Sequence, residues 1–200
     1  MCTRTSTGRQ KHKQIIDAAV AEFQEKGFSD ASMDRVSMRA DVSKRTVYKY
    51  FSSKENLFNE IVEIFSQYFA EMAEIQYQAE RPIRDQLIEL GWAEGEILMN
   101  PEIMAMARML ISETLRNPCL AAEAQGKIDK TKAFSTLMRG AAETGQLEVS
   151  DPDAAATEFL ALIKGKAFWP VMLGADPVSR DEMQDIIERS VEMITARYVP

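Results

Sequence analysis

The chain has 200 residues, of which 46% are hydrophobic and 28% charged, a balance typical of a globular protein of one domain or two small ones. No apolar run reaches the ~18 residues that a membrane span needs, and the polar, basic first 14 residues do not resemble a signal peptide. The formal net charge is −7. We therefore expect a cytoplasmic protein with no membrane association.

The charge is distributed unevenly along the chain. Residues 1–54 hold 11 Lys and Arg against 6 Asp and Glu, whereas the rest of the chain has a net charge of −12. A basic first quarter on an otherwise acidic chain indicates that the N-terminal part binds an anion and that the rest of the chain repels anions.

Apolar residues recur three or four positions apart throughout the chain, and this spacing predicts an all-α fold of about nine helices. The predicted helices cover, in chain order, about residues 10–26, a short segment after Ser32, 44–50, a long segment after Ser52, 83–98, 101–115, 118–143, 152–169 and 180–198.

Residues with helix-capping chemistry support several of these boundaries. Gly27 is suited to the end of the first helix, and Ser43 to the start of the third. Ser52 and Glu55 have the spacing of a capping box, as does the segment 179–182. Asparagine or aspartate precedes proline at three further predicted starts: Asn100-Pro101, Asn117-Pro118 and Asp151-Pro152.

Residues 32–51 have the organisation of a helix-turn-helix motif, in which the second helix enters the DNA major groove. Residues 42–54 contain four basic residues and no acid, although a purely structural helix favours acids in its first turn. On charge alone, a solvated basic face on a three-helix core explains the pattern equally well. In the DNA-binding interpretation, the candidate base contacts are Lys44, Arg45 and Lys49, and the candidate phosphate contacts are Thr46, Tyr48, Tyr50 and Lys54.

The residue string over 11–58 decides between these interpretations. It resembles the DNA-binding domain of the TetR/AcrR family of bacterial transcriptional regulators. The matching residues are Ala18-Ala19, Phe23, Gly27-Phe28, Val42-Ser43, Thr46-Val47-Tyr48, Tyr50-Phe51, Ser53-Lys54-Glu55 and Leu57. The resemblance implies that the start of the third helix contacts bases, that Tyr48, Tyr50 and Lys54 contact phosphates, and that Ser32 approaches the DNA backbone. Asp41 replaces the usual glycine of the turn, and we expect the turn to be intact because Asp tolerates the left-handed region.

Residues 113–174 are similar to the C-terminal domain of an AcrR-type subset of this family. The similar strings are ETLRNP, FSTLMRGAAETGQLEVSDPDAAATEFLALIKG and Leu173-Gly174. The resemblance implies dimerisation through the last two long helices and a small-molecule pocket. The expected organisation is a flexible tail over 1–8, a DNA-binding domain over 9–56, and a ligand-binding and dimerisation domain over 57–200.

The C-terminal part is rich in methionine and aromatic residues, which line apolar pockets but more often simply fill a core. The candidate pocket residues are Trp92, Met99, Met106, Met109, Phe134, Met138 and Trp169. The apolar stripes of the last two long helices look wider than one contact within the chain requires. The candidate dimer residues are Phe159, Ile163, Met183, Ile187, Val191 and Ile194.

Other chemistry has little support in the sequence. His12 is the only histidine, Cys2 and Cys119 are the only cysteines, and there is no phosphate-binding loop, so we expect no metal, no cofactor and no enzymatic activity. The prediction is a homodimeric repressor that binds a palindromic operator and is released by a small apolar ligand. The alternative is a DNA-binding structural or interaction protein of the same fold that lacks an effector.

Overall fold

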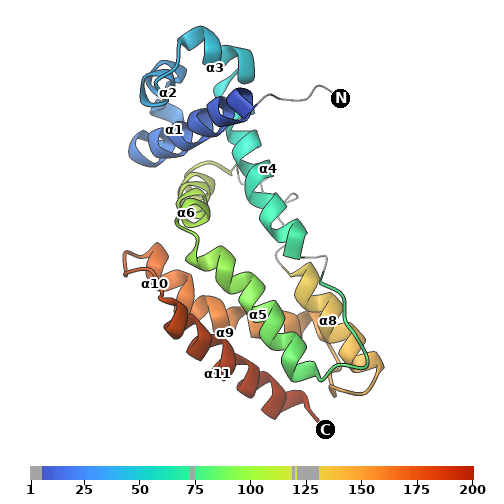
Figure 1. The fold of residues 1–200 in the computed structure, drawn as a ribbon. Helices are drawn as coiled ribbons and strands as arrows, with labels where there is room; N and C mark the ends of the chain where they lie inside the picture. The colour runs from blue at the N-terminus through green and yellow to red at the C-terminus, as the bar shows by residue number, and fades with distance from the viewer. Residues whose placement is uncertain (1–5, 73–74, 119, 121–130) are drawn as a thin grey trace. The chain divides into compact units, whose positions relative to one another are not determined.

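The computed structural model describes residues 6–72, 75–118, 120 and 131–200. Within these ranges the chain forms ten labelled helices and no strand (Figure 1), which confirms the predicted all-α fold. None of the helices in these ranges is both long and apolar enough to cross a bilayer.

The chain folds into two compact units. The N-terminal unit comprises residues 1–66 and 105–128, and the C-terminal unit comprises 67–104 and 129–200, as far as these ranges are described. The sequence predicts a domain boundary after residue 56, whereas the described residues 105–118 and 120 also belong to the N-terminal unit. Two helices have residues in both units: α4 (Lys54–Met72) and α6 (Pro101–Arg116).

The N-terminal unit begins with α1 (Ser6–Asp30), followed by α2 (Met33–Arg39) and α3 (Lys44–Tyr50). Residues 6–8 are therefore helical, although the sequence interpretation assigned them to the tail; residues 1–5 lie outside the described part. Helix α1 is interrupted at Gly27, where φ is 78° and ψ is 158°. This backbone conformation strongly favours glycine, in agreement with the predicted end of the first helix.

Three serines cap the next helices. The hydroxyl of Ser32 accepts the N–H of Arg35, and the hydroxyl of Ser43 accepts the N–H of Thr46. At α4, however, Ser53 accepts the N–H of Asn56 at 3.2 Å, whereas Ser52 accepts only the side-chain amide of that residue. The predicted cap at Ser52 is thus displaced by one residue.

The core of this unit is apolar and aromatic. The rings of Phe23, Phe28 and Phe58 cluster with centroids 5.4 to 6.4 Å apart. Val47 is the buried residue of α3 and anchors this short helix against the rest of the unit, so that its polar residues face outwards.

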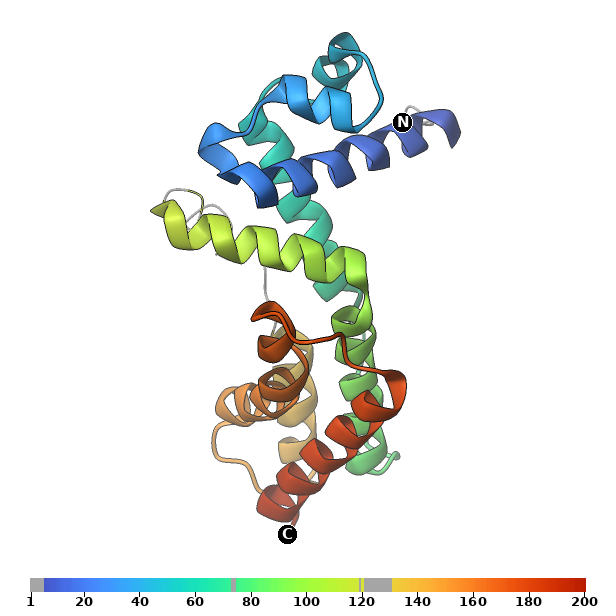
Figure 2. The ribbon, with the colours of Figure 1, turned by 90° about the vertical axis from the view of Figure 1, so that its left-hand side faces the viewer.

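The C-terminal unit contains α5 (Ile83–Met99), α8 (Lys132–Glu143), α9 (Pro152–Ala167), α10 (Trp169–Met172) and α11 (Arg180–Tyr198). Helix α11 packs along α5, and α9 contacts both of these helices as well as α8 (Figures 1 and 2). Close packing of α5 on α11 depends on Gly91, because a Cβ added there would lie 2.8 Å from Cγ2 of Ile187.

Two predicted helices of this unit differ in extent from the structure. The helix expected over 152–169 ends at Ala167, and the short α10 follows after a break at Phe168. Pro170 explains the break, because a proline inside a helix lacks an N–H and clashes with the carbonyl four residues earlier. The helix expected over 118–143 is not continuous: α8 begins after a bend at Thr131, and residues 119 and 121–130 lie outside the described part.

Candidate nucleic-acid interface

Helices α2 and α3 and the turn between them form the predicted helix-turn-helix motif. The turn bends at Asp41, whose φ of 49° is the only positive value at a non-glycine residue in the described ranges. It is closed by a hydrogen bond of 3.1 Å from the N–H of Val42 to the carbonyl of Ser37. The expectation that Asp41 preserves the turn is confirmed.

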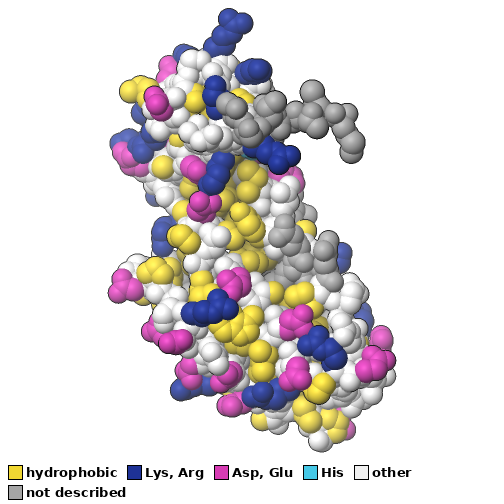
Figure 3. All heavy atoms as spheres, viewed as in Figure 1, with side chains coloured by type: hydrophobic (Ala, Val, Ile, Leu, Met, Phe, Trp, Pro, Cys, Tyr) yellow, Lys and Arg dark blue, Asp and Glu magenta, His cyan; other side chains and the backbone are white. Residues whose placement is uncertain are grey.

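Helix α3 presents cations to the solvent. Arg45 and Lys49 are exposed, and neither has an ion pair or a side-chain hydrogen bond with the described part of the chain. Figure 3 shows Lys and Arg side chains projecting from the surface at the top of the view. Unpaired guanidinium and ammonium groups on an exposed helix are suited to base edges and phosphates, because they lose no internal partner when they bind.

Lys44 differs from these two cations. Its ammonium nitrogen lies 2.7 Å from Oδ1 of Asp34, in the first turn of α2. The hydrogen bond with Asp34 and the charge of that carboxylate raise the pKa of Lys44 above its ordinary value. The predicted base contact at Lys44 is therefore already paired within the motif.

The predicted phosphate contacts lie in three different environments. Tyr48 is half exposed, and Thr46 shares a hydrogen bond with the Ser43 hydroxyl at 2.8 Å. The hydroxyl of Tyr50 donates to the carbonyl of Gly8 at 3.3 Å. The ammonium of Lys54 donates to the carbonyl of Ser29 at 2.9 Å and lies over a phenylalanine ring, so this lysine also holds the end of α1 in place.

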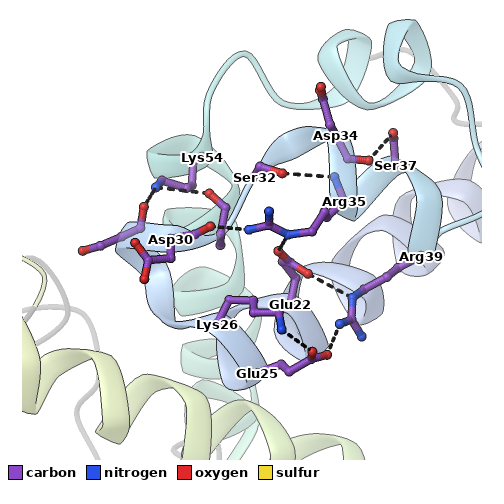
Figure 4. Close-up of polar contacts among 12 residues, drawn as sticks. Glu22, Glu25, Lys26, Asp30, Ser32, Asp34, Arg35, Ser37, Arg39 and Lys54 are labelled. Atoms are coloured by element: carbon purple, nitrogen blue, oxygen red, sulfur yellow. Dashed lines mark hydrogen bonds and ion pairs between the residues drawn. The ribbon is translucent and has the colours of Figure 1, made fainter.

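A buried glutamate of α1 holds α2, the first helix of the motif, through two ion pairs (Figure 4). Glu22 on α1 has no exposed surface, and its carboxylate oxygens contact Arg35 and Arg39 of α2. Arg39 also contacts Glu25, and the side chains of Lys26 and Arg39 lower the pKa of Glu25 to about 2. These contacts hold α2 against α1. They also pair Arg35 and Arg39 within the protein, although the sequence alone gives no sign that these two arginines have partners.

A further polar contact joins α1 to α4. Nε2 of His12 lies 3.0 Å from Oε1 of Glu60, and the imidazole packs against the rings of Tyr50 and Phe51. The contact extends the packing behind α3. Within the described ranges, no three His, Cys, Asp or Glu side chains are grouped so that they could hold a metal ion.

The predicted pocket residues are divided between the two compact units. Met106 belongs to the N-terminal unit with Met109, whereas Phe134 and Met138 lie in α8 of the C-terminal unit. Met109, Phe134 and Met138 have no exposed surface, and Met106 is buried. Trp92 and Met99 of α5 are partly exposed, with the guanidinium of Arg180 over the Trp92 ring. Trp169 is 52% exposed.

The structure corrects the predicted dimer contacts. Each of the six predicted side chains is at most 2% exposed in the single chain; they are Phe159, Ile163, Met183, Ile187, Val191 and Ile194. These residues form the core between α9, α11 and α5, so they have no surface left for a partner. The apolar stripes of α9 and α11 are wide because α5 packs against both helices within the same chain.

The helix-turn-helix geometry defines a DNA-binding protein, and comparisons with known proteins identify its family. Residues 15–61 match the family described as bacterial regulatory proteins, tetR family. Residues 85–200 match the C-terminal domain of AefR-like transcriptional repressors. The second match alone covers more than half of the chain. The chain therefore belongs to the TetR family of transcriptional regulators.

Individual relatives agree with this assignment. A TetR family regulator from Pseudomonas syringae pv. tomato is 37% identical, with 95% of this chain and 97% of that chain covered and a TM-score of 0.78. The flavonoid-responsive regulator FrrA is 25% identical, with 96% and 98% covered and a TM-score of 0.72. The regulator AcrR of Shigella flexneri is 32% identical over 83 residues, which are 41% of this chain and 38% of that protein.

Proposed function

We propose that this regulator is a repressor that binds a palindromic operator as a homodimer and is released by a small apolar ligand. The observation that carries the proposal is the pair of exposed, unpaired cations Arg45 and Lys49 on α3. The match to AefR-like repressors supports the direction of regulation. The proposed repressor acts on DNA in the cytoplasm, and the proposal includes no catalytic step.

The proposed dimer uses the outer faces of α9 and α11, which the chain leaves uncovered. On α9, Ala161 and Gly165 are exposed, and a Cβ added at Gly165 would meet no atom within 4 Å. Three large apolar side chains of the same unit are also exposed: Trp169 of α10 at 52%, Leu173 directly after α10 at 86%, and Met193 of α11 at 56%. Small residues allow two helices to approach closely, and a second copy would cover the large apolar ones. A palindromic target also requires a two-fold partner.

The proposed route of release is helix α6. Residues 101–104 of this helix belong to the C-terminal unit, and its remaining residues belong to the N-terminal unit. There, the side-chain amide of Gln24 donates to the carbonyl of Ala105 at 2.7 Å. The buried carboxylate of Glu113 accepts the N–H of Phe28 at 2.9 Å. A ligand that shifts α6 would therefore act on the end of α1, and a tenfold loss of DNA affinity requires only ~1.4 kcal/mol of coupling.

The proposed ligand is apolar and either neutral or cationic. The net charge of −12 beyond residue 54 disfavours anions. FrrA responds to flavonoids, which supports a small, largely apolar effector here. Among the predicted pocket residues outside the proposed dimer surface, the partly exposed Trp92 and Met99 keep surface available to a ligand.

The effector-free alternative has one observation in its favour. Met109, Phe134 and Met138 have no exposed surface, as expected of residues that fill a core. Titration of candidate ligands distinguishes the two functions, since both tryptophans lie in the C-terminal unit and a bound ligand raises the melting temperature by mass action. A protein that binds its operator while no ligand of a broad apolar panel changes fluorescence, melting temperature or operator affinity would support the alternative.

Selection of bound sequences from random duplexes tests the proposed function itself. We expect enrichment of a palindrome and, if each protomer neutralises about four phosphates, a slope of log affinity against log salt near −7. Light scattering of the free protein should give the mass of a dimer. A selection that enriches no sequence, or a stable monomer at micromolar concentration, would refute the proposal.

A further inference from the structure

An acidic side chain lies on the same surface as the proposed DNA-reading cations. Both Oδ atoms of Asp34 are within 2.9 Å of the Lys44 ammonium. The two side chains remain 60% and 58% exposed, so the pair is formed in contact with solvent rather than inside the core. It joins the first turn of α2 to the first turn of α3, the two helices of the motif.

This pair has two consequences for a polyanion that approaches α3. The carboxylate cancels the charge of Lys44, so this lysine adds little to non-specific attraction. It also restricts a long, flexible side chain to one direction. If the Lys44 ammonium must leave the carboxylate of Asp34 to contact a phosphate of non-specific DNA, the exchange of one anionic partner for another adds little binding free energy. The binding free energy is larger where a base edge offers hydrogen-bond acceptors to the Lys44 ammonium while Asp34 remains close enough to hold it.

We infer that Asp34 is a specificity-determining residue of the helix-turn-helix motif, which acts by holding Lys44 and thereby suppresses binding to DNA of the wrong sequence. The inference rests on the proposed function and extends it. Asp34 is a positioning residue in this scheme, since Lys44 makes the contact with DNA. The salt bridge replaces indiscriminate phosphate binding with a directed contact at one base pair of each half-site.

The test compares the wild type with Asp34→Asn on two duplexes, the selected operator and a mixed-sequence duplex. One additional free cation per protomer should steepen the slope of log affinity against log salt by about 1.8 for a dimer on the mixed duplex. Binding to this duplex should tighten on the order of tenfold at low salt, while the preference at one symmetry-related pair of base positions falls. The matched control is Asp30→Asn, which removes the same charge from the same unit at an exposed residue with no ion pair in the described ranges.

A double-mutant cycle shows whether the effect passes through Lys44. In a Lys44→Gln background, Asp34→Asn should change neither the salt slope nor the base preference, and Asp34→Glu in the wild type should retain both. Equal behaviour of Asp34→Asn and Asp30→Asn, or an effect that persists without Lys44, would overturn the inference. A wild type that prefers no sequence over the mixed duplex would instead refute the proposed function. Equal melting temperatures of the variants exclude a folding defect as the cause.

Discussion

Replacement of Glu113 by alanine should remove the acceptor of a buried hydrogen bond that joins α6 to the end of α1. Oε2 of Glu113 accepts the N–H of Phe28 at 2.9 Å, and the glutamate is 3% exposed. Alanine cannot replace this acceptor, so the N–H of Phe28 would be left buried and unpaired. The contact is local to the N-terminal unit, to which both residues belong.

The expected loss follows from the strength of such bonds. A hydrogen bond to a charged group contributes about 1.5–3 kcal/mol, and each kcal/mol shifts the melting temperature of a chain of this size by about 2–4 °C. Glu113→Ala should therefore lower the melting temperature by about 3–12 °C at fixed protein concentration. Glu113→Gln keeps an oxygen acceptor in the same place and should lose less than half of this.

Calorimetry of the two variants and of a matched control measures this effect. Leu115→Ala changes a residue of the same helix that is 82% exposed, and such surface substitutions alter stability by at most about 0.5 kcal/mol. If Glu113 joins α6 to α1, Glu113→Ala should also weaken the effect of any ligand on operator affinity. Equal melting temperatures of Glu113→Ala and Leu115→Ala would refute the reasoning.

Three further predictions follow from burial and charge. Ile187→Glu places a charge in the core and should unfold the C-terminal unit, whereas Ala161→Glu on the exposed face of α9 should give a folded monomer that no longer binds the operator. Circular dichroism measures the folding of each variant, and light scattering measures its mass. An Ala161→Glu variant that remains a dimer would contradict the proposed interface. Gly91→Ala should cost about 1–3 kcal/mol in urea denaturation, since its Cβ would meet Ile187 at 2.8 Å; an unchanged midpoint would show that the helices adjust freely. The pKa of Glu25 is lowered from 4.5 to about 2, so its ionised form stabilises the fold above pH 4.5, and this contribution is lost as the pH falls towards 2. The difference in melting temperature between wild type and Glu25→Gln should therefore vanish over this interval. A difference that does not change with pH would contradict this prediction.

Features with short-range causes could be predicted from the sequence. The caps at Ser32, Ser43 and Asp151 and the capping box of Ser179 with Glu182 depend on atoms within three residues, and all four are formed. The positive φ of Asp41 is similarly a property of one residue in a tight turn. The cap at Ser52 was wrong by one position, because two adjacent serines offer the same chemistry.

Features that depend on distant partners could not be predicted. Glu22 and Glu113 look like solvated charges in the sequence, yet both are buried against residues 13 or more positions away. The apolar periodicity of α11 predicts that Ile187 is buried but does not identify the helix that buries it. In the structure Ile187 packs against α5 of the same chain and not against a second chain. Likewise, no local signal shows that Lys44 is already held by Asp34.

The most direct test of the account is the base preference of Arg45→Ala. Affinities are measured for the selected operator and for duplexes in which each base pair is changed in turn, with Arg84→Ala as a control that removes the same charge from the C-terminal unit. If α3 reads the major groove, Arg45→Ala should lose ~1–3 kcal/mol of discrimination at one symmetry-related pair of positions, and Arg84→Ala should lose none. Uniform weakening across all duplexes, or an unchanged preference in Arg45→Ala, would contradict the account.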